Sequence, residues 1–309
     1  SSGVALRNAV VQATFVPPHY DTRSWSSGFM LRDVGPNEEH IVVIRSTGYW
    51  YHDLREGTAD GETVASKYSP HINTSQGSTN HVRVIALEDV GWLFINGNYI
   101  AELDLSGGPE TGKVRVIGGW WGSHIYAGET TGFEGFTVRS LQTIYGPEEG
   151  AIDHTAEDSS IDTHKSTAWL ADAIVEARFN NPYATSEGSW SPGFLLRTQG
   201  NAVHIIGITS GGYWYHYVGT GTMESRKQMQ YTFSKHIATS PSGGNSLRVI
   251  ALGDEGWFFI NGAYVAELDL SGWSGPGDIK AVANSYSGHG IAGKSTEFSG
   301  FVVWSVGDE

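Results

Sequence analysis

Two copies of an acidic strand motif are the residues best placed to do chemistry in this chain of 309 residues. The sequence Ala-Glu-Leu-Asp-Leu-Ser places Glu102 near Asp104 and, in its second copy, Glu267 near Asp269. Because successive side chains of a β-strand point to opposite faces, the two acids of each pair share a face. A retaining glycosidase needs two carboxyl groups about 5 Å apart. The motif therefore raises glycoside hydrolysis as a first hypothesis.

Histidine is the second residue type that could carry chemistry, and the chain has 12. The histidines are scattered, without the H-x-H or H-x-x-x-H spacing of metal ligands. A histidine in a strand is more often a hydrogen-bonded structural residue than a ligand. We therefore expect no metal site and no cofactor. Four histidines recur in the second half of the chain: His40, His52, His71 and His124 match His204, His216, His236 and His289.

Aromatic residues form a third group, and their chemistry is that of sugar binding. In the run from Tyr49 to His52, alternation places Trp50 and His52 opposite Tyr49 and Tyr51, so one pair can be core and the other exposed. Sugars stack their C–H faces on aromatic rings while polar neighbours bind the hydroxyls. The run therefore offers a surface on which a sugar could stack.

A glycine-rich stretch, residues 118–132, predicts a loop that presents two adjacent tryptophans in copy one only. Loop tryptophans suit sugar stacking, but they could also plug the end of a domain or pack against the other domain. We take the aromatic and histidine residues of these runs as ligand-binding candidates: Tyr49, Tyr51, His52, Trp120, Trp121, His124, Tyr213, Tyr215, His216, Tyr286 and His289.

Two β-hairpins are the elements that must position these residues. Residues 91–107 read GWLFINGNYIAELDLSG and residues 256–272 read GWFFINGAYVAELDLSG. Each places aromatic and β-branched runs on both sides of Asn-Gly, which suits a type I′ turn because both central residues need φ > 0.

The turn also predicts the pairing within each hairpin. Phe94 is expected opposite Tyr99, and Trp92 opposite Ala101, so that an aromatic face packs onto a core. The second hairpin repeats this pairing with Phe259 opposite Tyr264 and Trp257 opposite Ala266.

The hairpins belong to a long internal repeat. Trp92 matches Trp257 and Tyr49 matches Tyr213, an offset of about 165 residues, which indicates a domain duplication rather than a solenoid. We predict domains at 1–144 and 145–309. Residues 145–165 are acidic and rich in Ser and Thr, which favours a linker, although strand pieces within them could open the second domain. Nothing equivalent precedes copy one, so the first domain is predicted to lack its first strand.

Composition limits the fold and the partners. The chain has 41 Gly, 11 Trp, 14 Tyr and 12 Phe and no sustained helical periodicity, which predicts an all-β protein rich in turns. A net charge of −14 argues against nucleic acid and against an anionic membrane surface as partners. Without cysteine there is no disulfide framework, and no apolar stretch is long enough to be inserted in a membrane.

Four motifs give the chain a family resemblance. They are W-x-x-G-F-x-L-R (25–32 and 190–197), L/V-R-V-I-A-L (82–87 and 247–252), the F-I-N-G hairpin, and F-x-x-F-x-V (133–138 and 298–303). In these the chain resembles the concanavalin A-like lectin/glucanase superfamily, and more closely the laminin-G-like modules of bacterial extracytoplasmic proteins. The resemblance implies two tandem jelly-roll β-sandwiches located outside the cell. Members include lectins, carbohydrate-binding modules, glucanases and interaction domains, so fold alone assigns no function.

The same resemblance argues against the first hypothesis. Laminarinase-type glucanases carry E-x-D-x-x-E on one strand. Here Ser106-Gly107 and Ser271-Gly272 stand where the third acid would fall. We therefore interpret the two acids as a solvated strand edge, with no catalytic residue, and predict that the chain is not an enzyme.

The sequence leaves three functions in order of preference. The first is a non-catalytic binding or adhesion protein, extracellular or at the cell surface, whose partner is a glycan. The second is a structural subunit of an extracellular filament or surface layer, in which subunits associate by donating strands to one another. The third is a glycosidase whose site no motif reveals.

Overall fold

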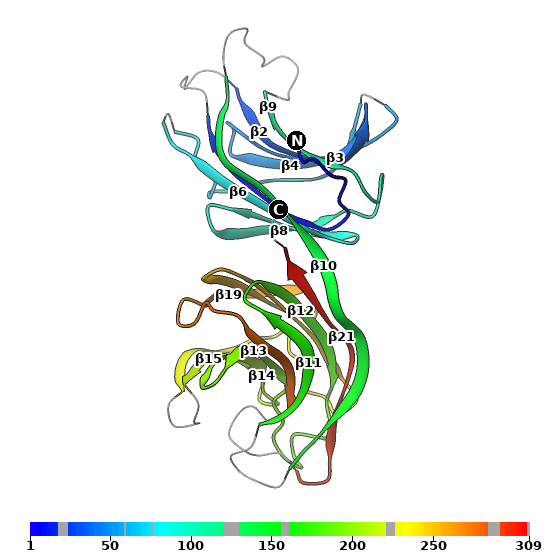
Figure 1. The fold of residues 1–309 in the computed structure, drawn as a ribbon, viewed down its shortest axis with the longest axis vertical. Helices are drawn as coiled ribbons and strands as arrows, with labels where there is room; N and C mark the ends of the chain where they lie inside the picture. The colour runs from blue at the N-terminus through cyan, green and yellow to red at the C-terminus, as the bar shows by residue number, and fades with distance from the viewer. Residues whose placement is uncertain are drawn as a thin grey trace. The chain divides into compact units, whose positions relative to one another are not determined.

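The structure is a computed structural model that describes residues 1–17, 24–58, 60–75, 77–119, 130–155, 161–220, 226–283 and 291–307. These residues form strands and turns without a helix, so the all-β prediction is confirmed (Figure 1). In particular, the described part of the chain has no helix with the length and apolar character needed to cross a membrane. The fold divides into two compact units, Ser1–Leu141 with Val306–Glu309 (unit 1) and Gln142–Ser305 (unit 2).

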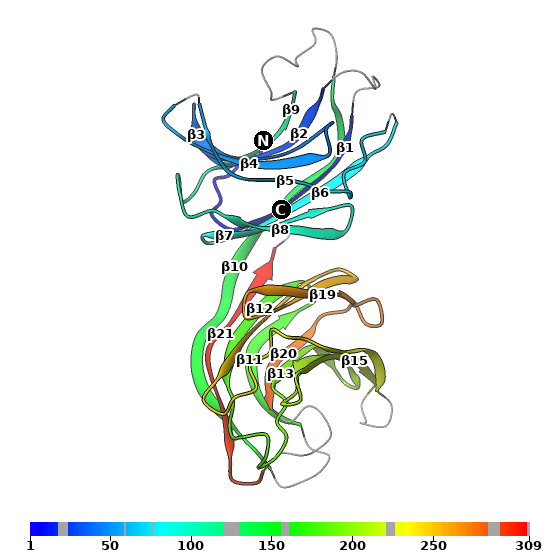
Figure 2. The same ribbon diagram turned by 180° about the vertical axis from the view of Figure 1, so that it is seen from behind.

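Unit 1 is a sandwich of two antiparallel sheets. Its strands are β1 (Ala9–Val16), β2 (Ser26–Gly35), β3 (Glu38–Arg45), β4 (Tyr49–Glu56), β5 (Glu62–Tyr68), β6 (Asn80–Leu87), β7 (Val90–Ile95), β8 (Asn98–Asp104), β9 (Lys113–Gly118) and the first part of β10 (Gly132–Asp153). One sheet has the order β5–β4–β3–β2–β9 and the other the order β10–β1–β6–β7–β8 (Figure 2).

Unit 2 repeats this arrangement with additional strands. It contains the second part of β10 with β11 (Asp162–Leu170), β12 (Ala173–Asn180), β13 (Gly193–Gln199), β14 (Ala202–Ile208), β15 (Tyr213–Thr220), β16 (Lys227–Phe233), β17 (Gly244–Leu252), β18 (Glu255–Ile260), β19 (Ala263–Asp269), β20 (Gly277–Ala283) and β21 (Ser295–Val306). Its sheets have the orders β11–β20–β13–β14–β15–β16 and β10–β21–β12–β17–β18–β19. Residues 145–165, expected to be mainly linker, thus include the end of β10 and the start of β11. The tandem duplication stays a prediction, which the matching strand orders support.

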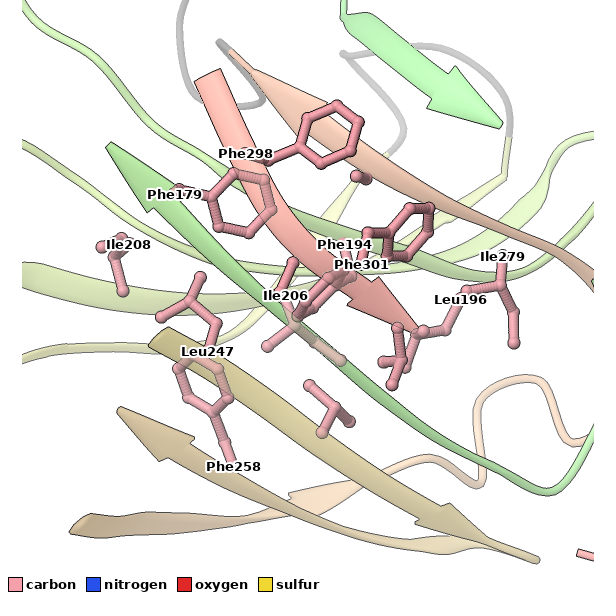
Figure 3. Packing of buried hydrophobic residues seen from close by; sticks show 14 of the residues in the cluster. Phe179, Phe194, Leu196, Ile206, Ile208, Leu247, Phe258, Ile279, Phe298 and Phe301 are labelled. Carbon is pink, nitrogen blue, oxygen red and sulfur yellow. The ribbon is translucent and has the colours of Figure 1, made fainter. Parts of the chain in front are cut away.

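Both sandwiches are held by a core in which alternate residues of each sheet interlock. In unit 2, Phe179 and Leu247 come from one sheet, Phe194 and Ile206 from the other, and all four are buried (Figure 3). Burying a side chain of this size contributes roughly 1.5–3 kcal/mol each. Because each strand gives every second residue to this core, its remaining residues are free for other roles.

The two Asn-Gly hairpins have the predicted turn. Asn96 has φ 51° and Gly97 φ 82°, and the second hairpin repeats both values within a few degrees. Such positive φ at both central positions is the requirement of a type I′ turn. The Asn96 side chain also donates a hydrogen bond to the His71 carbonyl at 2.7 Å, which ties the turn to the preceding loop.

Part of the predicted hairpin pairing is wrong. Phe94 does oppose Tyr99, but a bulge between Leu93 and Phe94 shifts the rest, so Ala101 opposes Leu93 and Trp92 opposes Glu102. A bulge places two residues of one strand against one of the other. Phe259 likewise opposes Tyr264, whereas Trp257 opposes Glu267 and Phe258 opposes Ala266.

The aromatic face of each hairpin is buried, as predicted: Trp92 and Trp257 are fully buried, and Phe94 and Phe259 are 1 % exposed. From the other face of β7, Leu93 and Ile95 enter the core between the two sheets of unit 1, because alternation places them opposite Trp92 and Phe94. The second hairpin contributes Phe258 to its core in the same way.

A buried arginine ends the W-x-x-G-F-x-L-R motif in each unit. Arg197 is 1 % exposed, and its guanidinium donates to the carbonyl oxygens of Ala171 (2.8 Å), Trp273 (3.1 Å) and Gly253 (2.6 Å). These three carbonyls come from separate connections between strands, so one side chain holds them together. Burial lowers the pKa of Arg197, and the Asp172 carboxylate, 3.8 Å away, opposes this shift. Arg32 occupies the same position in unit 1 and donates to the Leu105 carbonyl at 2.8 Å.

Replacing this arginine with an apolar side chain of similar length is expected to destabilise unit 2. Arg197→Met leaves three carbonyl acceptors without their donor, and we expect a loss of about 3 kcal/mol in the free energy of unfolding. Arg178→Met, at an exposed position of β12, is the matched control and should change it by less than about 0.5 kcal/mol. Urea unfolding of both variants measures the difference, and equal effects would show that the guanidinium is not an anchor.

Candidate functional site

Strand β4 divides its aromatic residues between the two faces of its sheet, as predicted. Trp50 is buried in the core of unit 1, and His52 is also buried. Tyr49 points the other way and is 42 % exposed, and Tyr51 is half-buried on the same face. We call the face that carries Tyr49 and Tyr51 the outer face of unit 1.

Three tyrosines form a platform on this outer face. The Tyr49 ring lies 6.4 Å from Tyr51 and 5.8 Å, edge to face, from Tyr68 of β5. Tyr68 is 55 % exposed, and its ring covers Gly48, where a Cβ would lie 2.8 Å from the ring. The Arg45 guanidinium lies 3.4 Å from the centre of the Tyr51 ring, a cation–π contact that orients this ring. The platform is therefore held by neighbours while two of its rings remain accessible.

Charged residues continue the same face along β3 and β4. The β3–β4 pairing is unbroken from Glu38 to Ile44, so Asp53 and Arg55 follow Tyr49 and Tyr51 in one row. Glu39 on β3 pairs with Arg55, and their side chains approach to 3.4 Å. Asp53 accepts a hydrogen bond of 2.7 Å from the Thr63 hydroxyl.

The charged end of this face is hollowed. A cavity of about 310 Å³ is lined by Glu39, Arg55, Asp33 and Arg115, together with Met30 and the β2–β3 turn. Arg115 forms an ion pair with Asp33, and Glu39 is 2 % exposed. Burial raises the pKa of Glu39, which the Arg55 charge partly offsets. A carboxyl group with its pKa raised by burial, next to a cavity, is a common mark of a functional site.

Unit 2 presents different chemistry on the matching face. Tyr213 stacks on Tyr231, with ring centres 4.8 Å apart and planes 11° from parallel, and Phe233 meets Tyr213 edge on at 5.8 Å. Tyr215, however, is fully buried in a second apolar cluster with Ile205 and others. A contact between Tyr215 and a surface ligand therefore does not fit the structure, because neighbouring apolar side chains cover its ring.

Sequence reasoning missed the charged residues of the outer face, because no motif contains them. A comparison of the two copies, position by position, could have drawn attention to two of them. The position of Glu39 holds Val203 in unit 2, and the position of Asp53 holds Tyr217. The two copies therefore present different side-chain chemistry at these positions. The missed residues are Asp33, Glu39, Asp53, Arg55 and Arg115.

Five of the predicted ligand-binding residues lie outside the described part of the chain. They are Trp120, Trp121, His124, Tyr286 and His289.

Two other predicted candidates, His52 and His216, lie in the interior and cannot meet a surface ligand. His52 Nε2 lies 3.1 Å from His40 Nδ1, and His40 Nε2 lies 2.8 Å from the Gly107 carbonyl oxygen. The carbonyl accepts only, so His40 must carry its proton on Nε2 and accept from His52 through Nδ1. His216 and His204 repeat this pair at 3.0 Å. Both pairs are structural hydrogen-bonded units, as the sequence favoured for histidines in strands.

The acidic strand motif has a local role. Asp104 accepts hydrogen bonds from the Ser106 hydroxyl (2.6 Å) and the Ser106 backbone N–H (3.0 Å), which lower its pKa. Asp269 and Ser271 repeat this arrangement at the same distances. The aspartates therefore cap the turn after their strands as ionised groups, which suits the strand-edge interpretation better than the role of a general acid.

Comparison with known proteins finds similarity at the level of fold. No protein-family model and no curated protein matches the chain. Carbohydrate binding module CBM66 from Bacillus subtilis matches with 11% identity over 53% of this chain and 95% of its own, at a TM-score of 0.38. An endo-β-1,3-glucanase from Pyrococcus furiosus matches with 12% identity over 56% of this chain and 78% of its own, at 0.37. Domains LG4-5 of the mouse laminin α1 chain match with 12% identity over 100% of this chain and 89% of theirs, at 0.28.

The two antiparallel sheets of each unit agree with the predicted jelly-roll sandwich, and the superfamily resemblance stays a prediction. The matches contradict the prediction that the chain is not an enzyme. Glycoside hydrolases, the Pyrococcus glucanase among them, are found among the matched structures. The missing third acid was too narrow a criterion, because it concerned one strand and not the whole surface of the sandwich.

The buried histidine pairs predict that the protein loses stability in acid. Burial, with the neighbouring His204 second, lowers the pKa of His216 from 6.5 to about 3. A group whose pKa is depressed by folding takes up its proton more readily when unfolded, so stability falls as pH drops below 6.5. The loss is about 1.4 kcal/mol per pH unit for each such histidine, or about 2 kcal/mol at pH 5.

The substitution His216→Gln tests this effect, because glutamine still has an N–H to donate. Denaturant unfolding at pH 7 and pH 5 should show about 2 kcal/mol less pH dependence in this variant than in the parent. His236→Gln removes an exposed histidine of the same unit and should keep the parent's pH dependence. An unchanged pH dependence in His216→Gln would rule out this histidine as the cause.

Proposed function

We propose that the chain is an extracellular or cell-surface glycan-binding protein whose site is the outer face of unit 1. The observation that carries the proposal is the continuous row Tyr49, Tyr51, Asp53 and Arg55 on β4. It joins accessible aromatic rings to the buried carboxylate of Asp53 and the half-buried guanidinium of Arg55. This is the combination that sugar recognition needs, with rings for the C–H faces and charged acceptors and donors for the hydroxyls.

The arrangement of the row also favours a neutral glycan. Side chains two residues apart on a strand are separated by roughly 7 Å, so a sugar stacked on Tyr51 would bring its hydroxyls near Asp53. Four charged groups of this face are paired with one another, Glu39 with Arg55 and Arg115 with Asp33. The net charge of −14 further disfavours a strongly anionic glycan.

The site stands on a rigid element, which supports binding further. Tyr49, Tyr51, Asp53 and Arg55 all lie in a strand that is hydrogen-bonded on both sides, between β3 and β5. Residues held in this way lose little conformational entropy when a ligand binds.

A filament or surface-layer subunit built by strand donation is the alternative. Its support is that part of β10 in unit 1 has no further strand described beside it. Donation of this chain's own residues 142–153 to a second copy, however, would uncover unit 2 of the donor. Each chain would still have one uncovered sheet edge after the exchange, so the exchange has little driving force. We therefore prefer the glycan-binding proposal.

A glycan array followed by calorimetry tests the proposal. We expect a neutral oligosaccharide to bind, and Tyr49→Ala to weaken this binding at least about tenfold, a loss of about 1.4 kcal/mol, because a stacking surface is removed. Tyr213→Ala is the matched control at the same position of unit 2 and should bind like the parent. Asp53→Asn should weaken binding as well, since the carboxylate becomes a weaker acceptor.

The same samples separate the remaining functions. Release of reducing ends from the bound glycan would show turnover, and its loss in Glu39→Gln would place the reaction at the cavity. Tyr49 is exposed, so its replacement should leave the unfolding midpoint nearly unchanged. Equal binding by the parent and Tyr49→Ala would reject the outer face of unit 1 as the glycan site.

A further inference from the structure

In unit 2, the second part of β10 covers two phenylalanines of β21. The Tyr145 ring meets the Phe301 ring edge on, with centres 5.3 Å apart. His164 of β11 lies 4.9 Å from the Phe298 ring and 3.2 Å from the Tyr145 hydroxyl. Under this cover Phe298 is 3 % exposed and Phe301 fully buried.

The covering strand has strict local requirements. A Cβ at Gly146, whose φ is +77°, would lie 2.0 Å from the Phe301 carbonyl oxygen. A Cβ at Gly150 would lie 2.7 Å from the Phe298 ring. Two residues further on, Ile152 enters the core of unit 2. The strand that fits this place therefore reads Tyr-Gly-Pro-x-x-Gly-x-Ile.

In unit 1, the first part of β10 occupies the place that β21 has in unit 2. Phe133 pairs with Phe15 of β1, as Phe298 pairs with Phe179 of β12. The second phenylalanine of each strand is also placed alike. Phe136 stacks on Phe29 with ring centres 6.3 Å apart and planes 24° from parallel, and Phe301 stacks on Phe194 at 6.3 Å and 22°.

The outer side of the two strands differs. Phe133 is 52 % exposed, against 3 % for Phe298, and Phe136 is only partly buried. Within the described residues, the strand pairing of residues 133–137 runs to β1 alone. Nearer the end of this part of β10, the Gly307 N–H donates to the Ser140 carbonyl at 2.9 Å. We call residues 133–137, with their two phenylalanines, the open edge of unit 1.

We propose that the open edge of unit 1 binds an extended segment of a partner polypeptide by β-strand addition. The added strand would run antiparallel to β10, as residues 142–153 run along β21. Main-chain hydrogen bonds supply affinity in this mode, and the side-chain positions supply specificity. An aromatic residue of the added strand would cover Phe136, as Tyr145 covers Phe301. A glycine of the added strand would lie over the Phe133 ring, as Gly150 lies over the Phe298 ring.

The partner is a different polypeptide rather than a second copy of this chain. Residues 142–153 are already used in unit 2, so donation between copies would leave one edge open in every chain. A different polypeptide with a segment of this sequence pattern would cover the open edge of unit 1 without uncovering unit 2. This surface belongs to the sheet opposite the proposed glycan site, so the inference stands independently of the proposed function.

A synthetic peptide of residues 142–155 is the direct probe of this edge. Labelled and added to the full-length protein, it should bind with a dissociation constant below about 100 µM, and hydrogen exchange at the amides of residues 133–137 should slow on binding. Gly150→Val in the peptide should weaken binding at least tenfold, because the added side chain meets the Phe133 ring. Phe133→Ser in the protein should weaken it to the same extent.

Two controls keep the test specific. Tyr49→Ala removes an exposed ring elsewhere in unit 1 and should leave peptide binding unchanged. A copy of residues 142–165 fused ahead of Ser1 should fill the edge within the chain and abolish peptide binding. The unfolding midpoint of Phe133→Ser shows whether this exposed position has changed the fold, and the Gly150→Val peptide tests the edge without altering the protein.

Several outcomes would overturn the proposal. One is no binding at 1 mM peptide, and another is binding that neither substitution weakens. Slowed exchange along β21 instead of residues 133–137 would mean that the peptide replaces the chain's own strand in unit 2. A dimer that dissociates as the peptide binds would assign the open edge to a second copy of the chain.

Discussion

In each sandwich, the hydrogen bonds of one buried guanidinium group hold together several connections between strands. Arg32 and Arg197 each give up water and are compensated by carbonyl oxygens from different connections between strands. Burying a charge is costly unless it is fully hydrogen-bonded, so each arginine forces these connections into a single arrangement. Glycine is required at Gly277, where a Cβ would lie 2.3 Å from the Arg197 backbone.

The period of two along each strand then separates stability from function. In β4 the residues that face inward, Trp50 and His52, complete the core, so the residues between them can vary without loss of the fold. The two copies use this freedom differently. Unit 1 carries Glu39 and Asp53 on the outer face, whereas unit 2 fills the matching face with an apolar cluster. A duplicated fold can in this way keep one core and present two chemistries.

Covering a sheet edge is a separate problem that the two units solve differently. Unit 2 uses part of the connection between the units as its additional strand, which buries Phe298. The same phenylalanine position in unit 1, Phe133, keeps half of its surface exposed. Exposed apolar surface next to unpaired backbone groups is what proteins usually avoid, so its presence points to interaction rather than to stability.

Local patterns in the sequence by themselves determined the strand content, the Asn-Gly turns and the division of β4 into two faces. These depend on residues close in sequence, where φ preferences and alternation act directly. Tertiary structure alone decided which residues surround the outer face of unit 1. The bulge at Leu93, the burial of Glu39 beside Arg55 and the exposure of Phe133 all depend on strands distant in sequence. Packing between such strands sets the burial of each group, and burial sets its pKa and its access to a ligand.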